Sequence, residues 1–301
     1  AIQAAQELTE KMLYTAALFH HQQAQGMKRA GKQEEMLLRY KAAADAYGRH
    51  LAMFPHSKNA YELSYYYADC LFFSEQYEKA AVQYEKVRDS TGGDKYAADS
   101  MLSSVVAWEK AMEVEIKSGK LPVLKILSVK DRKKGEKIQP KPMAEIRKRY
   151  IADAEIMLKR FPENENTPMV AYSVALLYFQ HDYFEESRKR FSEIIEKWPK
   201  MEIAKDAANL IIESYLVYED WKKVAEWSDR IQQKGLGDEK FKGEMGKMEV
   251  GAMYNHALQL FNERRFEEAA AEYIRLVNSK PDNDFADKAL NNAALANQNI
   301  R

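Results

Sequence analysis

The sequence has little of what marks an enzyme, a disulfide-linked domain or a membrane protein. Its single cysteine, Cys70, cannot form an internal disulfide, and its place in a helical pattern indicates a small buried residue rather than a reactive thiol. No apolar run approaches the roughly 18 residues that a membrane span needs. Glycine and proline are few, at 12 and 8, and lie mostly at expected helix ends. Because strand-like alternation is missing outside one insertion, we expect an all-α chain.

The charges balance. Lysine and arginine number 46 and so do aspartate and glutamate. A neutral chain lacks the basic field that general nucleic-acid binding requires, and an anionic membrane surface is equally unfavourable as a main partner. The hydrophobic content of 46% is enough for a core beneath a charged helical surface.

No motif for catalysis, a cofactor or a metal stands out. The segment 243–247 lacks the spacing and the hydroxyl residue of a phosphate-binding loop. Of the six histidines, only His20 and His21 are close in sequence, and neighbours on a helix point about 100° apart, so they are poorly placed to share a metal. Acidic pairs such as Glu185 and Glu186 open expected helices, where they complement the helix dipole. We therefore expect a non-catalytic protein without a cofactor.

What the chain does contain is a repeated signature. An aromatic residue is followed after three positions by a small residue, after four more by a second aromatic, and after about eight more by proline or glycine. Three of the five intervals between the small positions are 37 residues, and the other two are 70 and 45. A fixed period in this range predicts a solenoid of helix pairs. The copies are Tyr40, Ala43, Tyr47, Pro55; Tyr77, Ala80, Tyr84, Gly92; Arg147, Tyr150, Ala154, Pro162; Phe184, Ser187, Phe191, Pro199; Trp221, Val224, Ser228, Leu236; and Phe266, Ala269, Tyr273, Pro281.

Each signature lies on the second helix of an expected pair, which in the second copy covers about residues 76–88 after a first helix at 60–73. The small residue marks the place where the two helices cross, because a large side chain would push them apart. Proline or glycine then ends the second helix. One pair cannot bury its apolar face alone, so stacked pairs must share a continuous core.

This spacing resembles the tetratricopeptide repeat family, with the small positions of the first helices at Ala68, Ala175 and Ala257. The period is longer than the usual 34 residues of that family, and Tyr150 and Val224 replace the small residue in two copies. The resemblance implies a right-handed superhelical solenoid of about six pairs and a final helix. Family members that grip a carboxylate terminus use lysine, asparagine and arginine. Here Asp69, Leu176, Glu213 and Leu258 stand at the key asparagine positions, so binding of that kind is not expected.

We expect one domain over residues 1–301. Its repeats would cover about 1–55, 56–92, 93–162, 163–199, 200–237 and 238–281, followed by a terminal helix at 283–300. We expect the first helix to cover about residues 3–30, which is long enough to cap the array. No second helix follows the terminal one, so we expect the chain to be part of a longer parent protein.

The first helices would line the inside of the superhelix. Aromatic side chains there provide large contact areas at low entropic cost, which predicts a groove for an apolar or aromatic segment of a partner protein. Packing within the array is the alternative for each of these residues. The predicted groove residues are Tyr65, Tyr66, Asp69, Tyr172, Phe179, Tyr254 and Phe261.

Residues 119–142 interrupt the third repeat between its two helices. The apolar positions from Leu121 to Val129 would form a short strand or pack on the solenoid. A basic cluster follows, which belongs either to a solvated loop or to a docking element for an acidic partner. The candidate contacts in it are Lys130, Arg132, Lys133 and Lys134.

The sequence therefore predicts a scaffold or adaptor that binds other proteins, with no nucleic-acid partner and no membrane span. Residues 54–63 and 65–69 are similar to long-repeat proteins of bacterial envelopes, including deltaproteobacterial gliding-motility proteins, and more loosely to the outer-membrane assembly lipoprotein with such repeats. That similarity implies a place in the periplasm or at the outer membrane. Two alternatives stay open: a cytoplasmic co-chaperone or regulatory module, and a binder of polysaccharide or peptidoglycan, since aromatic grooves also stack on sugars.

Overall fold

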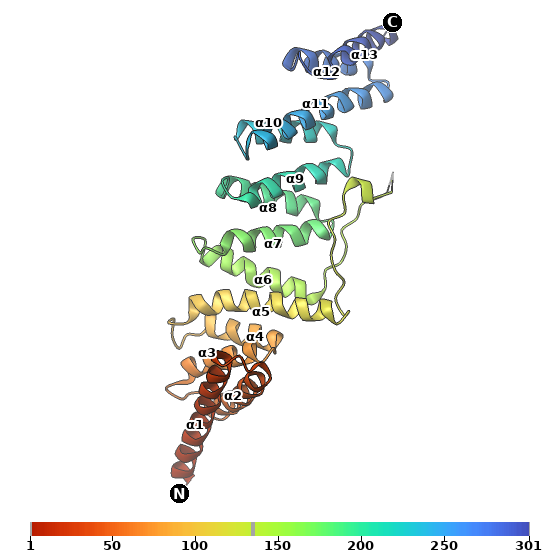
Figure 1. Cartoon of the computed structure of the whole chain (residues 1–301). Helices are drawn as coiled ribbons and strands as arrows, with labels where there is room; N and C mark the ends of the chain where they lie inside the picture. The colour runs from red at the N-terminus through yellow and green to blue at the C-terminus, as the bar shows by residue number, and fades with distance from the viewer. Residues whose placement is uncertain (1, 134–135, 301) are drawn as a thin grey trace. The chain divides into compact units, whose positions relative to one another are not determined.

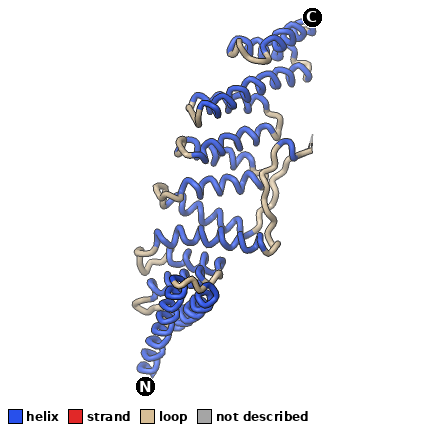
Figure 2. The backbone as a smooth tube through the Cα atoms, viewed as in Figure 1, coloured by secondary structure: helices blue, strands red, loops and turns tan. Residues whose placement is uncertain are grey.

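The computed structural model describes residues 2–133 and 136–300 (Figure 1). Within these residues every regular element is a helix (Figure 2), which confirms the all-α prediction. The α-helices are α1 (Ile2–Arg29), α2 (Gln33–Met53), α3 (Ala60–Phe73), α4 (Tyr77–Arg88), α5 (Ala97–Lys117), α6 (Glu145–Arg160), α7 (Thr167–Gln180), α8 (Phe184–Lys197), α9 (Glu202–Leu216), α10 (Trp221–Gln233), α11 (Glu239–Asn262), α12 (Phe266–Ser279) and α13 (Ala286–Asn299).

The chain divides into two compact units. Unit 1 comprises Ala1–Val123 and Met143–Thr167, and unit 2 comprises Leu124–Pro142 and Pro168–Arg301. From α1 to α6 in unit 1, and from α8 to α13 in unit 2, each helix packs against the next one in sequence. Packing between sequence neighbours is how repeat proteins build a core, and the pairs are TPR-like. The prediction of one domain and a right-handed superhelix stays a prediction.

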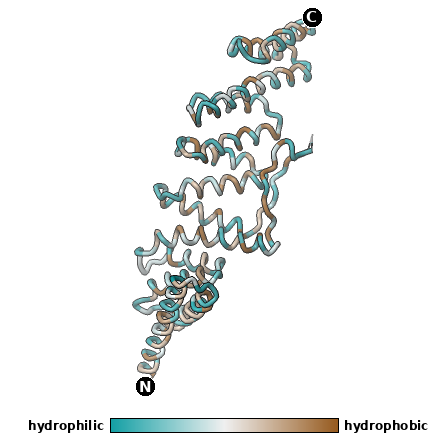
Figure 3. Tube along the Cα trace, viewed as in Figure 1, coloured by the Kyte–Doolittle hydropathy of each residue, from teal (hydrophilic) through white to brown (hydrophobic). Residues whose placement is uncertain are grey.

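The signature residues build the core of the pairs. The first aromatic is the first residue of α4, α8, α10 and α12. The small residues of these helices are completely buried, as are the second aromatics of α8 and α12, Phe191 and Tyr273. Apolar and polar residues alternate along the helices in Figure 3, as expected where one face of each helix packs on its neighbours. The residues at the small position of the signature are Ala80, Ser187, Val224 and Ala269.

Four second helices end two residues before a proline, with one non-helical residue between. The residue before each proline has φ between −130 and −140 and ψ between 53 and 69, outside the helical region. These residues are Phe54, Phe161, Trp198 and Lys280. The proline ring disfavours helical geometry in the residue before it, and proline itself has no N–H for the helix. The repeated proline thus ends each helix at the same point of the repeat.

The tight turn inside four of the pairs has a feature that the sequence did not reveal. Glu75, Asp182, Glu219 and Arg264 have positive φ, between 51 and 62, and each lies two residues before the first aromatic of a signature. Left-handed backbone is unfavourable for residues other than glycine. Packing of the two helices therefore imposes this conformation on the turn.

The third pair departs from the signature because of its insertion. Arg147 stands in place of the first aromatic, is buried, and donates from Nη2 to the carbonyl oxygen of Pro122 at 2.6 Å. Tyr150 stands in place of the small residue, and its hydroxyl donates to Glu109 at 2.9 Å. The two residues that depart from the signature therefore have a structural role: they join α6 to α5 and to the start of the insertion.

The insertion contains no strand in its described residues. It holds a single 3-10 turn, η1 (Val129–Asp131), and is otherwise extended coil. Leu121 is buried in unit 1, and Ile138 packs against the hydrophobic core of unit 2. Of the two expectations for this segment, packing on the helices is the one observed.

The buried small residue gives a direct test of the packing. Ala269→Leu should lower the free energy of unfolding by about 1–3 kcal/mol, because the added atoms have no space where α11 and α12 meet. Ala271→Leu, at an exposed position of the same helix, is the matched control and should change stability little. Urea unfolding followed by circular dichroism measures both, and equal effects would contradict close packing at Ala269.

The left-handed turn gives a second test. Arg264→Gly should raise the free energy of unfolding by up to about 1 kcal/mol, because glycine adopts positive φ without a steric penalty. Its neighbour Glu263 has a φ of −77, so Glu263→Gly should be neutral or destabilising. The same urea titration compares them, and a destabilised Arg264→Gly variant would show that the turn is not strained.

Candidate partner-binding surface

Three tyrosines come together on the first helices of unit 1. Tyr65 and Tyr66 lie on α3, and Tyr96 immediately precedes α5. The rings of Tyr65 and Tyr96 stack with centroids 4.3 Å apart and an interplanar angle of 6°. The ring centroid of Tyr66 lies 6.3 Å from that of Tyr96 and 5.8 Å from that of His21 of α1. The aromatic residues of consecutive first helices thus form one surface.

Glu62 carries a negative charge on this surface. The hydroxyls of Tyr96 and Tyr66 both donate to its Oε1, at 2.8 and 2.9 Å, and Lys95 lies 3.6 Å away. These hydrogen bonds, that of Tyr96 first, lower the pKa of the carboxyl below its usual value. Its side chain is 42% exposed, so the charge is accessible from solvent.

Asp69 lies two turns further along α3. Burial raises its pKa to about 6, although the Tyr84 hydroxyl donates to it. The carboxyl is therefore mostly ionised at pH 7 and stands in a largely desolvated place. We call Glu62, Tyr65, Tyr66, Asp69 and Tyr96 the acidic–aromatic surface.

The predicted groove residues of unit 2 mainly hold the repeats together. Phe179 is only 1% exposed and belongs to the core, so its assignment to a groove is wrong. Tyr254 stacks on Phe285 at 4.8 Å, and the Asn292 amide donates to its hydroxyl at 3.0 Å. Tyr172 and Phe261 are partly buried, with ring contacts to Phe191 at 5.8 Å and to Phe266 at 5.3 Å.

The sequence reasoning missed the partners of Tyr65 and Tyr254. Tyr96 and Phe285 each immediately precede the first helix of the following pair, 19 residues after the first aromatic of the signature. Each stacks on the first-helix tyrosine of the pair before. The equal spacing of 19 residues is visible in the sequence. The sequence alone does not show that these residues contact the tyrosines, because the contact depends on how the helices pack.

The residues of the basic cluster in the insertion differ in their exposure to solvent. Lys130 and Lys133 are exposed, as a docking role would require. Arg132 is 8% exposed and paired with the carboxylate of Asp182, so it is not free to meet an acidic partner as predicted. Lys134 lies outside the described residues.

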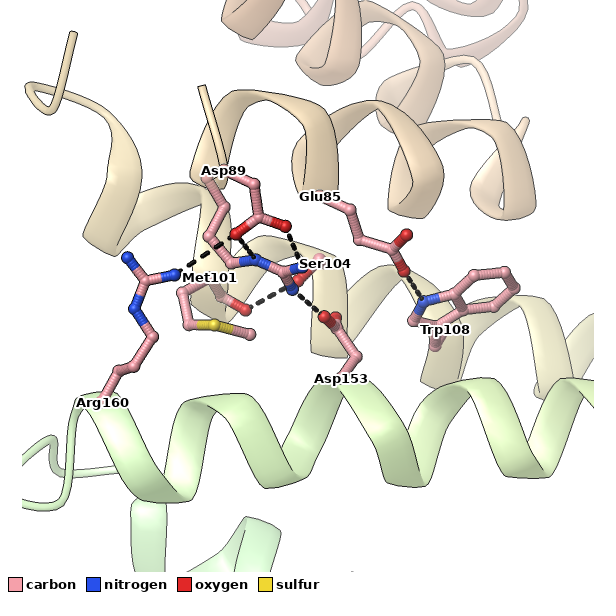
Figure 4. A network of polar contacts seen from close by, with 8 residues as sticks. Glu85, Asp89, Met101, Ser104, Trp108, Asp153 and Arg160 are labelled. Atoms are coloured by element: carbon pink, nitrogen blue, oxygen red, sulfur yellow. Dashed lines mark hydrogen bonds and ion pairs between the residues drawn. The ribbon is translucent and has the colours of Figure 1, made fainter. Parts of the chain in front are cut away.

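A second charged cluster, between α4, α5 and α6, is part of the core (Figure 4). Arg88 pairs with Asp153 of α6, and both side chains are at most 5% exposed. Arg88 Nε also donates to Asp89 at 2.8 Å, and Arg160 reaches Asp89 at 3.3 Å. Burial raises the pKa of Asp153 above its usual value, and the neighbouring Arg88 guanidinium opposes that rise by stabilising the charged carboxylate. The buried pair joins α4 to α6, while Asp89 and Arg160 lie at its exposed edge.

Two further features concern metals and membranes. Among residues 2–133 and 136–300, no three His, Cys, Asp or Glu side chains are grouped so that they could hold a metal ion. In the same part of the chain, no helix combines the length and the apolar character of a membrane span.

Comparison with known proteins gives distant structural neighbours. No protein-family model and no curated sequence matches the chain. A tetratricopeptide repeat protein from Parabacteroides merdae is similar at 10% identity over 93% of this chain and 99% of that one, with a TM-score of 0.38. The apo form of RapI is similar at 9% identity over 99% of this chain and 81% of that one, with a TM-score of 0.40. The description of the fold as TPR-like rests instead on the helix pairs and their repeated signature.

The buried ion pair makes a quantitative prediction. Asp153→Asn should lower the free energy of unfolding by about 3 kcal/mol, because it leaves the Arg88 charge buried without its main partner. Asp89→Asn, whose side chain is 52% exposed, should cost less than about 1 kcal/mol. The double variant Arg88→Met, Asp153→Leu should recover most of the loss in urea unfolding. A double variant as unstable as Asp153→Asn would show that the pair is not the source of the effect.

Proposed function

We propose that this protein is a non-catalytic scaffold that binds a segment of a partner protein on the acidic–aromatic surface of unit 1. Arrays of TPR-like helix pairs are typically interaction scaffolds, and their first helices present side chains at regular intervals. The observation that carries the proposal is the pair of half-buried carboxylates, Glu62 and Asp69, set among Tyr65, Tyr66 and Tyr96.

The chemistry of this surface suggests the partner. Tyrosine rings provide apolar contact and attract cations over their faces, and the two carboxylates attract a basic side chain. The partner segment would therefore combine apolar or aromatic residues with a lysine or arginine. Stacking between Tyr65 and Tyr96 already occupies one face of each ring, which leaves less aromatic area for a sugar than a polysaccharide groove would need.

Photo-crosslinking tests this proposal. A benzophenone amino acid in place of Tyr65 should form a protein adduct in the native cell, and the same group in place of the exposed Leu295 should not. In a Glu62→Gln, Asp69→Asn background, the yield should fall about tenfold, the equivalent of ~1.4 kcal/mol of binding free energy.

The control background is Glu78→Gln with Asp94→Asn, which removes two exposed acids elsewhere in unit 1 and should leave the yield unchanged. Circular dichroism confirms that each variant is folded. Equal adduct yields in both backgrounds, or an adduct from position 295 alone, would refute binding at the acidic–aromatic surface.

We also propose a bacterial envelope location for this scaffold, on the resemblance of residues 54–69 to envelope repeat proteins. Fractionation of cells that express the native full-length protein tests this part separately. Recovery in the cytoplasmic fraction would overturn the location and favour a co-chaperone or regulatory module, while leaving the binding surface untouched.

A further inference from the structure

The residues between Leu124 and Pro142, which we call the strap, are fastened to unit 2 by polar anchors. The backbone N–H of Val129 donates to Glu213 Oε1 of α9 at 2.6 Å. The Arg132 guanidinium pairs with the carboxylate of Asp182, which follows α7. Lys141 reaches the other oxygen of Asp182 at 2.8 Å, and its backbone N–H donates to the carbonyl oxygen of His181 at 2.8 Å.

Asp182 differs from the equivalent residues of the other pairs. Glu75, Glu219 and Arg264 occupy the same left-handed turn position and are exposed, whereas Asp182 is only 4% exposed. Burial alone would raise its pKa, but the hydrogen bonds and charges of Arg132 and Lys141 lower it below the usual value. The strap therefore buries a carboxylate that the other turns leave in water, and supplies two cations to it.

Arg132 is held between a carboxylate and an aromatic ring. Its guanidinium meets a carboxylate at one side and lies 5.5 Å from the ring centre of Phe184, which in turn contacts the ring of Tyr218 at 5.9 Å. Arginine is suited to this combination because its planar group forms directional hydrogen bonds and also stacks on aromatic faces.

Beside this anchor lies a cavity of about 650 Å³. Its lining includes Pro140 of the strap and Asp182, Phe184, Glu186 and Tyr218 of the helices and turns. Space for further side chains thus adjoins the arginine position.

Over its described residues, 124–133 and 136–142, the strap has little regular structure. Its regular element is the 3-10 turn η1, closed by hydrogen bonds from Ser128 to Asp131 at 2.8 and 2.9 Å. Ile126 is 46% exposed and Val129 is 39% exposed, so these apolar residues are only partly covered. The segment depends on contacts with unit 2 for its conformation, as a bound peptide does.

We propose that Asp182, Phe184 and Glu213 form a second peptide-docking site, which the strap occupies in cis. The external occupant that fits is a partner segment with the chemistry that the strap itself displays: an extended backbone that presents an arginine to Asp182 and an N–H to Glu213. Such a segment replaces the strap at its anchors. This site lies in unit 2 and does not depend on the acidic–aromatic surface of unit 1.

A peptide in trans tests the proposal. The probe is a fluorescein-labelled synthetic peptide of residues 124–142, and fluorescence anisotropy measures its binding to the full-length chain. Arg132→Gln with Lys141→Gln in the chain removes both cations from Asp182 and should free the site. The peptide should then bind at least tenfold more tightly than to the wild-type chain, whose strap competes with it. Adding Asp182→Asn to this released variant should abolish the gain.

The matched control removes two charges from the same strap without touching an anchor. Lys130→Gln with Lys133→Gln, both exposed lysines, should bind the peptide as weakly as the wild type. A peptide carrying Arg132→Gln should bind the released variant at least tenfold more weakly than the native peptide.

Hydrogen exchange of the released variant completes the test. The amides of Val129 and Lys141 should exchange faster than in the wild type, while helix amides of α8 and α9 stay protected, which excludes global unfolding as the cause. Protected helices without any binding of the peptide, or binding that survives Asp182→Asn, would overturn the proposal. Neither result would bear on crosslinking at Tyr65, so the two proposals fail separately.

Discussion

The close approach of two helices at a small residue is the constraint on which the rest of the structure depends. Ala80, Ser187, Val224 and Ala269 are completely buried where the second helices meet their neighbours. The short side chain at this position lets the two helices of a pair approach closely, and the close contact then leaves no room for a larger side chain. The left-handed turn before four of the signatures and the proline after four of them follow from the same geometry, since both fit the chain to closely packed helices.

Many aromatic residues that suggested a binding groove instead join one helix pair to the next. Tyr254 is stacked on Phe285 and accepts a hydrogen bond from Asn292, and Phe179 lies in the core. Repeat proteins have only local contacts, so each interface between pairs must supply its own stabilisation. In unit 1 the same kind of stack, between Tyr65 and Tyr96, stands beside ionised Glu62 and leaves a surface with mixed acidic and aromatic character.

The insertion in the third pair shows how such an array accommodates an irregular segment. Arg147, in place of the usual aromatic, holds the backbone of Pro122 where the segment begins, and Asp182 holds it through Arg132 and Lys141 further on. Charged side chains are used at both places because extended backbone must find hydrogen-bond partners outside regular structure. The segment is thereby attached at discrete points rather than packed along its length.

The sequence by itself determined the helical class, the pairing of helices and the residues that end them, because these depend on local periodicity, on proline geometry and on small residues at a fixed spacing. Ala80, Phe191 and Pro199 have the places that their spacing predicts. Only the tertiary structure decided which way a side chain of a first helix points. Tyr65 and Phe179 occupy helices with apolar residues on several sides, so periodicity could not separate surface from core. It also decided that Arg132 is buried against Asp182, since that pair joins residues 50 positions apart and leaves no local pattern.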